Sequence, residues 1–181
     1  LNDYNDTAAG LKERKKIRLR IYGDRTDPLW LEKKEKHEML IFKKRVKLEA
    51  NDQAELIRGS KLRLLETLKK RGEGSSEEIF RALLEERLRP HILVRYIRKP
   101  FVGAIRITLD YNLEACQTND LGYTRAMRNV HPGKAVLEAK FSSVLPFWFK
   151  TILEEFNLSR TTFSKYVESV ETLYRYHPIP R

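Results

Sequence analysis

Arginine and lysine recur at every second residue in several stretches of this chain. Alternate side chains of an extended strand point to the same face, so this spacing gathers positive charge on one side of each stretch. Aliphatic residues such as Ile17, Leu19 and Ile21 occupy the intervening positions. The cations that share such faces are Arg18, Arg20, Lys34, Lys36, Lys43, Arg45, Arg98, Arg106 and Lys140.

Charged faces of this kind have two interpretations, and the residues leave both open. In the first, the faces line a wet interior in which a bound anion relieves the repulsion between the cations. Phosphate suits such a lining, because arginine offers it a bidentate fork and lysine a point charge. In the second, the strands form an ordinary sheet with a buried aliphatic face and a solvated charged face. The scarcity of Ser, Thr and Gln on these faces favours the first.

Three carboxylates fall on the same faces as the cations: Glu32, Asp110 and Glu138. Carboxylate oxygens suit Mg²⁺ or Mn²⁺, and either ion bridges phosphate oxygens. The sequence therefore predicts a metal ion held by one or more of these three carboxylates. The alternative for Glu138 is a structural ion pair with Lys140 or Arg106.

The composition indicates a globular domain with an anionic partner. The 181 residues carry a net charge of +11, which predicts nucleic acid, anionic lipid or a phosphorylated small molecule as that partner. Cys116 is the single cysteine, so an internal disulfide is impossible and a reducing, cytoplasmic compartment is expected. The chain contains no apolar run of membrane-spanning length, and its four histidines show no metal-ligand spacing.

The alternation also predicts where the strands and helices lie. A hairpin is expected from Trp30 to Leu48, and a turn at Gly23–Asp24 and Asp27–Pro28 precedes it. Helical spacing of apolar residues predicts a helical insert over about 51–89 and two helices over about 145–175. Further strands are predicted over 14–22, 91–101, 104–110 and 134–141, with a weaker candidate over 114–120.

The fold class predicted from these elements is α+β with antiparallel strands. If the charged faces point inward, the strands close into a barrel or tunnel with a polar cationic interior. Its aliphatic outer face would then be covered by the helices of 51–89 and 145–175. Barrels of about eight strands are just wide enough to hold a small ligand. If the charged faces point to water, an open sheet with the same alternation results.

Six ordered segments resemble a known family. They are KIRLRIYG, LEKKEK followed by IFKKR, RYIRKPF with IRITLD, VLEAKF, LPFWF and FSKY, spread from about residue 11 to about residue 175. This set resembles the VTC domain, the polyphosphate polymerase domain of vacuolar transporter chaperone proteins, within the triphosphate tunnel metalloenzymes. The resemblance implies one tunnel domain over 1–181. Family members carry a preceding segment that completes the tunnel, so we expect this chain to lack an N-terminal portion.

The resemblance also implies roles for individual residues. The metal-binding glutamate falls on Glu138, and the catalytic set falls on Arg18, Arg20, Arg98, Arg106 and Glu138. Tyr96 and Lys165 fall on phosphate-binding positions of the family. The alternative for Tyr96 is a packed aromatic, and the alternative for Lys165 is a surface lysine on a helix. The phosphate-binding positions fall on Arg18, Arg20, Lys34, Lys43, Arg45, Tyr96, Arg98, Arg106, Lys140 and Lys165, and Lys36 shares their face.

The activity that the resemblance implies is transfer of the γ-phosphate of ATP to a growing polyphosphate chain, with Mn²⁺ or Mg²⁺ as cofactor. Two alternatives stay open: a tunnel triphosphatase that hydrolyses triphosphate or nucleotides, and a non-catalytic domain that binds polyphosphate or inositol phosphates. Nucleic acid is not expected as a partner, because the spaced carboxylates would repel a phosphate backbone. Other subunits are left unspecified.

Overall fold

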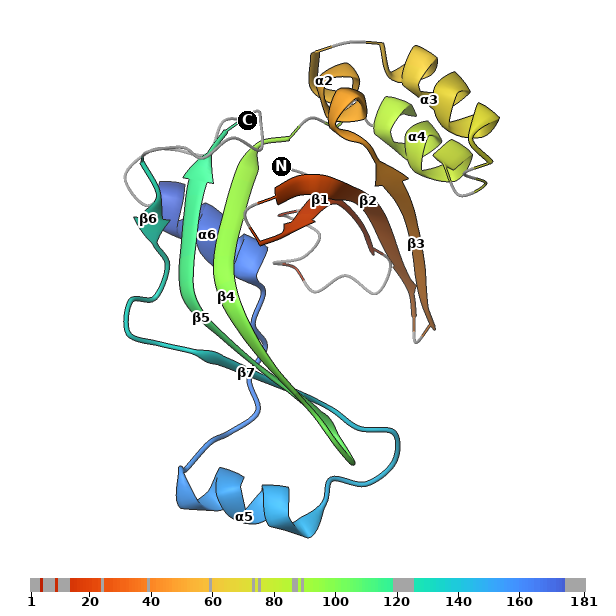
Figure 1. The fold of residues 1–181 in the computed structure, drawn as a ribbon. Helices are drawn as coiled ribbons and strands as arrows, with labels where there is room; N and C mark the ends of the chain where they lie inside the picture. Colours follow the sequence, from red (N-terminus) through yellow and green to blue (C-terminus); the bar gives the residue numbers. More distant parts are fainter. Residues whose placement is uncertain are drawn as a thin grey trace. The chain divides into compact units, whose positions relative to one another are not determined.

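The computed structural model describes residues 4, 9, 14–23, 25–38, 40–58, 60–72, 74, 76–85, 88, 90–118 and 126–174. The chain divides into two compact units (Figure 1). Unit 1 comprises Leu1–Leu93 and Gln117–Tyr123, and unit 2 comprises Val94–Cys116 and Thr124–Arg181. Each unit has its own sheet and helices, so the predicted α+β class with antiparallel sheets is confirmed. The strands of the described residues form no closed barrel.

The sheet of unit 1 is an antiparallel meander of β1 (Arg14–Tyr22), β2 (Arg25–His37) and β3 (Leu40–Leu48). Gly23, with a φ of 68°, makes the predicted turn after β1. The prediction of a turn at Asp27–Pro28 is wrong, because both residues lie within β2. The β1–β2 register shifts between Arg20 and Tyr22, so Pro28 falls at an irregularity where its missing N–H is tolerated.

One face of this sheet is aliphatic and carries the core of unit 1. The row Leu19, Leu31 and Val46 crosses the three strands in register. The helices α2 (Ala50–Arg58), α3 (Lys61–Lys70) and α4 (Ser76–Glu85) pack together beside β3 and supply the other half of the core (Figure 1). The prediction that the insert 51–89 covers the aliphatic face is therefore confirmed in this unit. The buried core residues are Leu29, Leu31, Val46, Leu48, Leu56, Leu64, Leu68, Ile79, Phe80 and Leu83.

A charged cluster attaches α4 to the sheet where the aliphatic face ends. Lys33 is 7% exposed, and its Nζ lies 2.7 Å from Glu35 and 3.0 Å from Glu78 of α4. Glu78 also pairs with Lys44. Burial alone would lower the pKa of Lys33, but the bonds from Glu35 and Glu78 outweigh it and raise that pKa. The bonds from Lys44 and then Lys33 lower the pKa of Glu78. Lys33 and Glu78 are thus both ionised at neutral pH.

We expect Glu78→Gln to destabilise unit 1 by about 1 kcal/mol at pH 7, because half-exposed ion pairs contribute little more than that. The pKa of Glu78 is lowered by folding, so its contribution is present above the ordinary value of 4.5 and is lost as pH falls. Urea unfolding at pH 7 and at about pH 3 measures both effects. Glu77→Gln is the control, since Glu77 pairs only at the surface, with Lys69. A deficit that persists unchanged at acid pH would contradict the ion-pair explanation.

The sheet of unit 2 is built on β5 (Arg106–Gln117). β4 (Ile92–Val102) pairs with one edge of β5, and β6 (Arg128–Asn129) and β7 (Val136–Lys140) pair antiparallel along the other edge (Figure 1). In the weak strand candidate at 114–120, residues 114–117 are the end of β5 and not a separate strand, and residues 119–120 lie outside the described residues. This arrangement places side chains of β4, β5 and β7 in neighbouring rows on one face.

The C-terminal helices are α5 (Phe147–Glu155) and α6 (Lys165–Tyr174). The prediction that both cover the aliphatic face is wrong for α6, because its Lys165 contacts Asp110 and Tyr96 on the charged face. α5 buries Phe149, whereas Phe147 is 83% exposed. The polar partners of Lys165 hold α6 on the charged face. None of the helices in the described ranges is long and apolar enough to cross a membrane.

Candidate functional site

The charged face of the unit 1 sheet is organised around Glu32. In register, Arg18 of β1 and Arg45 of β3 flank Glu32 on β2. Arg18 Nε donates to Glu32 Oε2 at 2.7 Å, and Arg20 Nε lies 3.7 Å from the same oxygen. Arg45 stacks over the Trp30 ring at 4.6 Å. Glu32 therefore holds two arginines side by side on this face.

This face carries far more positive than negative charge. Among the described side chains of β1, β2 and β3 that share it, Glu32 is the single carboxylate. One carboxylate cannot balance so many cations, so the face attracts anions with several charged groups. The cations are Lys16, Arg18, Arg20, Lys34, Lys36, Lys43, Arg45 and Lys47.

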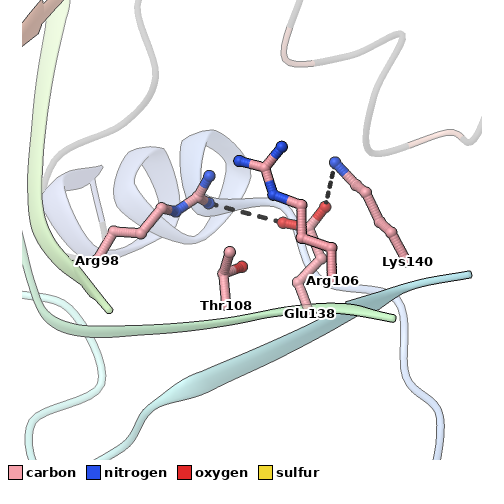
Figure 2. Close-up of a pocket in the computed structure, with 5 residues that line it drawn as sticks. All are labelled: Arg98, Arg106, Thr108, Glu138 and Lys140. Atoms are coloured by element: carbon pink, nitrogen blue, oxygen red, sulfur yellow. Dashed lines mark ion pairs between the residues drawn. The ribbon is translucent and has the colours of Figure 1, made fainter. Parts of the chain in front are cut away.

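The charged face of unit 2 contains a small pocket, drawn in Figure 2. Arg98 comes from β4, Arg106 and Thr108 from β5, and Glu138 and Lys140 from β7. Thr108 is directly opposite Glu138, and Arg106 is directly opposite Lys140. The space that the centre of a water-sized sphere can occupy in the pocket is about 10 Å³, far below the volume of a whole small-molecule site. The pocket thus suits one anionic group of a larger ligand.

Asp110 anchors the base of this site. Its carboxylate accepts from Arg98 Nε and Nη2, each at 2.7 Å, and Lys165 Nζ of α6 lies 2.6 Å from Oδ2. Burial alone would raise the pKa of Asp110, but the bonds from Arg98 and Lys165 outweigh it and lower that pKa. The bond to Asp110 raises the pKa of Arg98. Asp110 therefore stays ionised and fixes the Arg98 guanidinium.

Glu138 is the acidic group of the pocket itself. Its carboxylate lies 2.9 Å from Lys140 Nζ and 3.6 Å from Arg98 Nη2, and its side chain is 39% exposed (Figure 2). The bond from Lys140, and then the charge of Arg98, lower the pKa of Glu138. The structural pair with Lys140 that the sequence left open is therefore present. The carboxylate remains ionised and reachable from solvent.

Arg106 is the pocket cation without an ion pair among the residues that the structure describes. Its side chain is exposed and points into the pocket (Figure 2). Beside it, Thr108 is 4% exposed, and its hydroxyl has no hydrogen-bond partner. Arg106 and Thr108 thus present donors to the pocket that no described side chain accepts.

Tyr96 and Lys165 complete the inner end of the site. The Tyr96 ring centroid lies 5.5 Å from the Arg98 guanidinium and 5.0 Å from Lys165 Nζ. Contacts of this length are in the range of cation–π attraction. Tyr96 therefore braces two cations of the site and is more than a packed aromatic, and Lys165 is a paired side chain at one fifth exposure rather than a surface lysine.

The sequence matches the VTC domain over residues 1–174. The chain belongs to the VTC domain family. The resemblance inferred from the six segments is thus confirmed. A search of curated proteins found no match to the chain. The family is associated with polyphosphate polymerase activity, so membership indicates a polyphosphate-related function.

The residues of this VTC domain fit a divalent cation at Glu138. Mg²⁺ is commonly held by one or two carboxylates together with substrate phosphates and water, and Glu138 is an ionised carboxylate at a pocket lined by the cations Arg98, Arg106 and Lys140. Asp110 fits less well, since Arg98 and Lys165 already bind its oxygens. Glu32 lies in unit 1 and bonds to Arg18. The described residues contain no cluster of three His, Cys, Asp or Glu side chains that could hold a metal.

The predicted site residues fall into two groups. Arg98, Arg106, Glu138 and Lys140 line one pocket in unit 2, and Tyr96, Asp110 and Lys165 surround its base. Those of unit 1 are Arg18, Arg20, Glu32, Lys34, Lys36, Lys43 and Arg45, all on its charged face.

Sequence reasoning missed Thr108 and the pair between His131 and Glu168. Thr108 alternates with Arg106 and Asp110, so the period of two was a signal for its place in the pocket. His131 Nε2 lies 2.6 Å from Glu168 Oε2 and attaches the segment before β7 to α6. No local pattern joins two residues that are 37 positions apart.

We expect Asp110→Asn to lower the free energy of unfolding by about 3 kcal/mol, because it leaves Arg98 and Lys165 without the buried charge they share. Glu114→Gln is a matched control. Glu114 is also a β5 carboxylate bound by a β4 arginine, Arg95, but this pair is partly exposed and should contribute less than about 1 kcal/mol. Urea unfolding measures both. Equal losses in the two variants would contradict the special role of the buried pair.

Proposed function

We propose that this VTC domain transfers the γ-phosphate of ATP to the end of a polyphosphate chain in a metal-dependent reaction. The observation that carries the proposal is the pocket of unit 2. It combines the cations Arg98, Arg106 and Lys140 with a single ionised carboxylate, Glu138. Family membership adds the association with polyphosphate. The reaction needs alignment and charge neutralisation more than covalent help from the protein.

In this reaction a terminal oxygen of polyphosphate forms a bond to the γ-phosphorus of ATP. The bond from that phosphorus to the oxygen bridging it to the β-phosphorus breaks, and ADP leaves with the electron pair. Hydrogen-bond donors that are already in place stabilise the negative charge on the oxygens of the phosphoryl group during its transfer. Arg106 has no ion pair among the described residues, and Arg98 is oriented by Asp110, so both suit this role.

Glu138 would hold Mg²⁺ or Mn²⁺, and the ion would supply positive charge that neutralises the phosphates. Lys140, 2.9 Å from Glu138, would then contact a phosphate oxygen. Tyr96 and Lys165 would position the inner end of the site, because Tyr96 contacts both Lys165 and Arg98. Each of these tasks uses a contact or charge that is present before any ligand binds.

The charged face of unit 1 would bind phosphates as well. Its surplus of cations over one carboxylate suits a chain of phosphates better than a single group. With this assignment, Arg18, Arg20, Lys43 and Arg45 would be the phosphate-binding residues of this unit. Lys34 and Lys36 would extend the same row of cations.

Incubation of the chain with ATP and Mn²⁺ tests the proposed function. We expect ADP and long polyphosphate, separated by gel electrophoresis and quantified after enzymatic digestion. Formation of free phosphate without polyphosphate would show that the domain hydrolyses ATP, and would contradict the proposed transfer. Retention of polyphosphate without turnover of ATP would replace it with a binding role.

Glu138→Gln should reduce ADP formation by about 100-fold or more, because the amide loses the charge that holds the metal. The melting temperature should change little, since the Glu138–Lys140 pair is partly exposed. Glu114→Gln removes a carboxylate from β5 outside the pocket and should retain activity. A Glu138→Gln enzyme as active as wild type would remove the metal assignment.

A further inference from the structure

The Thr108 hydroxyl is the buried polar group of the pocket that its surroundings leave unsatisfied. Thr108 is 4% exposed, and its Oγ1 makes no hydrogen bond with any residue that the structure describes. Leaving a buried hydroxyl without a partner destabilises the folded state, so such groups call for an explanation. Thr108 lines the pocket together with the charged side chains of β4, β5 and β7 (Figure 2).

The chemistry of the neighbours shows what would satisfy this hydroxyl. Arg98, Arg106 and Lys140 carry donors and no acceptor. Glu138 is an acceptor, but its carboxylate pairs with Lys140 and Arg98 and not with Thr108. The pocket therefore offers a set of donors that converge on one small space. A group rich in acceptor oxygens would satisfy all of them together, and a phosphoryl group is such a group.

We propose that the Thr108 hydroxyl donates a hydrogen bond to a non-bridging oxygen of the phosphoryl group bound by Arg98 and Arg106. The inference rests on the proposed function and adds a neutral, substrate-binding donor to its cations. Thr108 lies opposite Glu138 in the β5–β7 register, so a metal at Glu138 and the hydroxyl would approach the phosphoryl group from neighbouring strands.

The hydroxyl contacts the phosphate directly, so its contribution does not depend on the metal. Metal independence distinguishes the role of Thr108 from that of Glu138, whose contribution requires a bound cation. A substitution by valine distinguishes phosphate contact from a structural role. Valine has nearly the shape of threonine, and replacing an unsatisfied hydroxyl with a methyl group should leave stability unchanged or improve it.

The test is calorimetric titration of inorganic tripolyphosphate into wild type, Thr108→Val and Thr108→Ser, each in EDTA and in Mn²⁺. We expect Thr108→Val to bind about tenfold more weakly in both conditions, the effect of one hydrogen bond to a charged group. Thr108→Ser should bind like wild type. The melting temperature of Thr108→Val without ligand should not fall. Ser169→Ala removes another buried, unpartnered hydroxyl, outside the pocket, and should bind like wild type.

Several results would overturn the inference. Wild-type affinity in Thr108→Val would show that the hydroxyl does not contact phosphate. A loss confined to Mn²⁺ would show that Thr108 acts through the metal. A loss that accompanies a lower melting temperature and is shared by Thr108→Ser would show a packing role. Wild type that binds no tripolyphosphate in either condition would instead reject the proposed function, and the Thr108 contact with it.

Discussion

The buried carboxylate of Asp110 is the constraint on which the rest of unit 2 depends. A charge removed from water must be matched by partners with good geometry, and Asp110 obtains two of them, from β4 and from α6. Through this one side chain, the neighbouring strands β4 and β5 are joined to α6, which lies more than fifty positions further along the chain. The same bonds orient Arg98, so the stability of the fold and the geometry of the pocket have a common origin.

The helices of the two units bind to their sheets in different ways. In unit 1, α2, α3 and α4 bury leucine and isoleucine against an aliphatic face, and the charged face stays clear of them. In unit 2, α6 reaches the charged face through Lys165. Asp110, which Lys165 contacts, is 2% exposed, and an electrostatic contact that is shielded from water is stronger than one at the surface.

Much of this organisation could be predicted from periodicity. The alternation over 14–22 matches β1 residue for residue, and the period of two assigned Arg106 and Asp110 to the face that carries the pocket. Pro28 was misleading, because the register irregularity between β1 and β2 places extra residues in β2 and so accommodates a residue that usually ends pairing.

Two features of unit 2 could not be predicted from the sequence: the face of the sheet that α6 packs on, and the missing hydrogen-bond partner of the Thr108 hydroxyl. Amphipathic spacing shows that α6 has a buried side, but not whether a sheet's aliphatic or charged face receives it. Thr108 looked like an ordinary strand residue, because a missing hydrogen-bond partner is a property of the folded surroundings and not of the residue. Pairings such as Lys165 with Asp110 join residues more than fifty positions apart.

The two short strands that share one edge of β5 also limit how this chain can vary. β6 is held by the bond from Val130 N to Leu113 O, and His131 is fastened to α6, so the start of the connection to β7 is fixed. Gain or loss of one residue between these anchors and β7 would turn Glu138 and Lys140 to the opposite side of the sheet. Evolution can therefore change the composition of this connector more freely than its length.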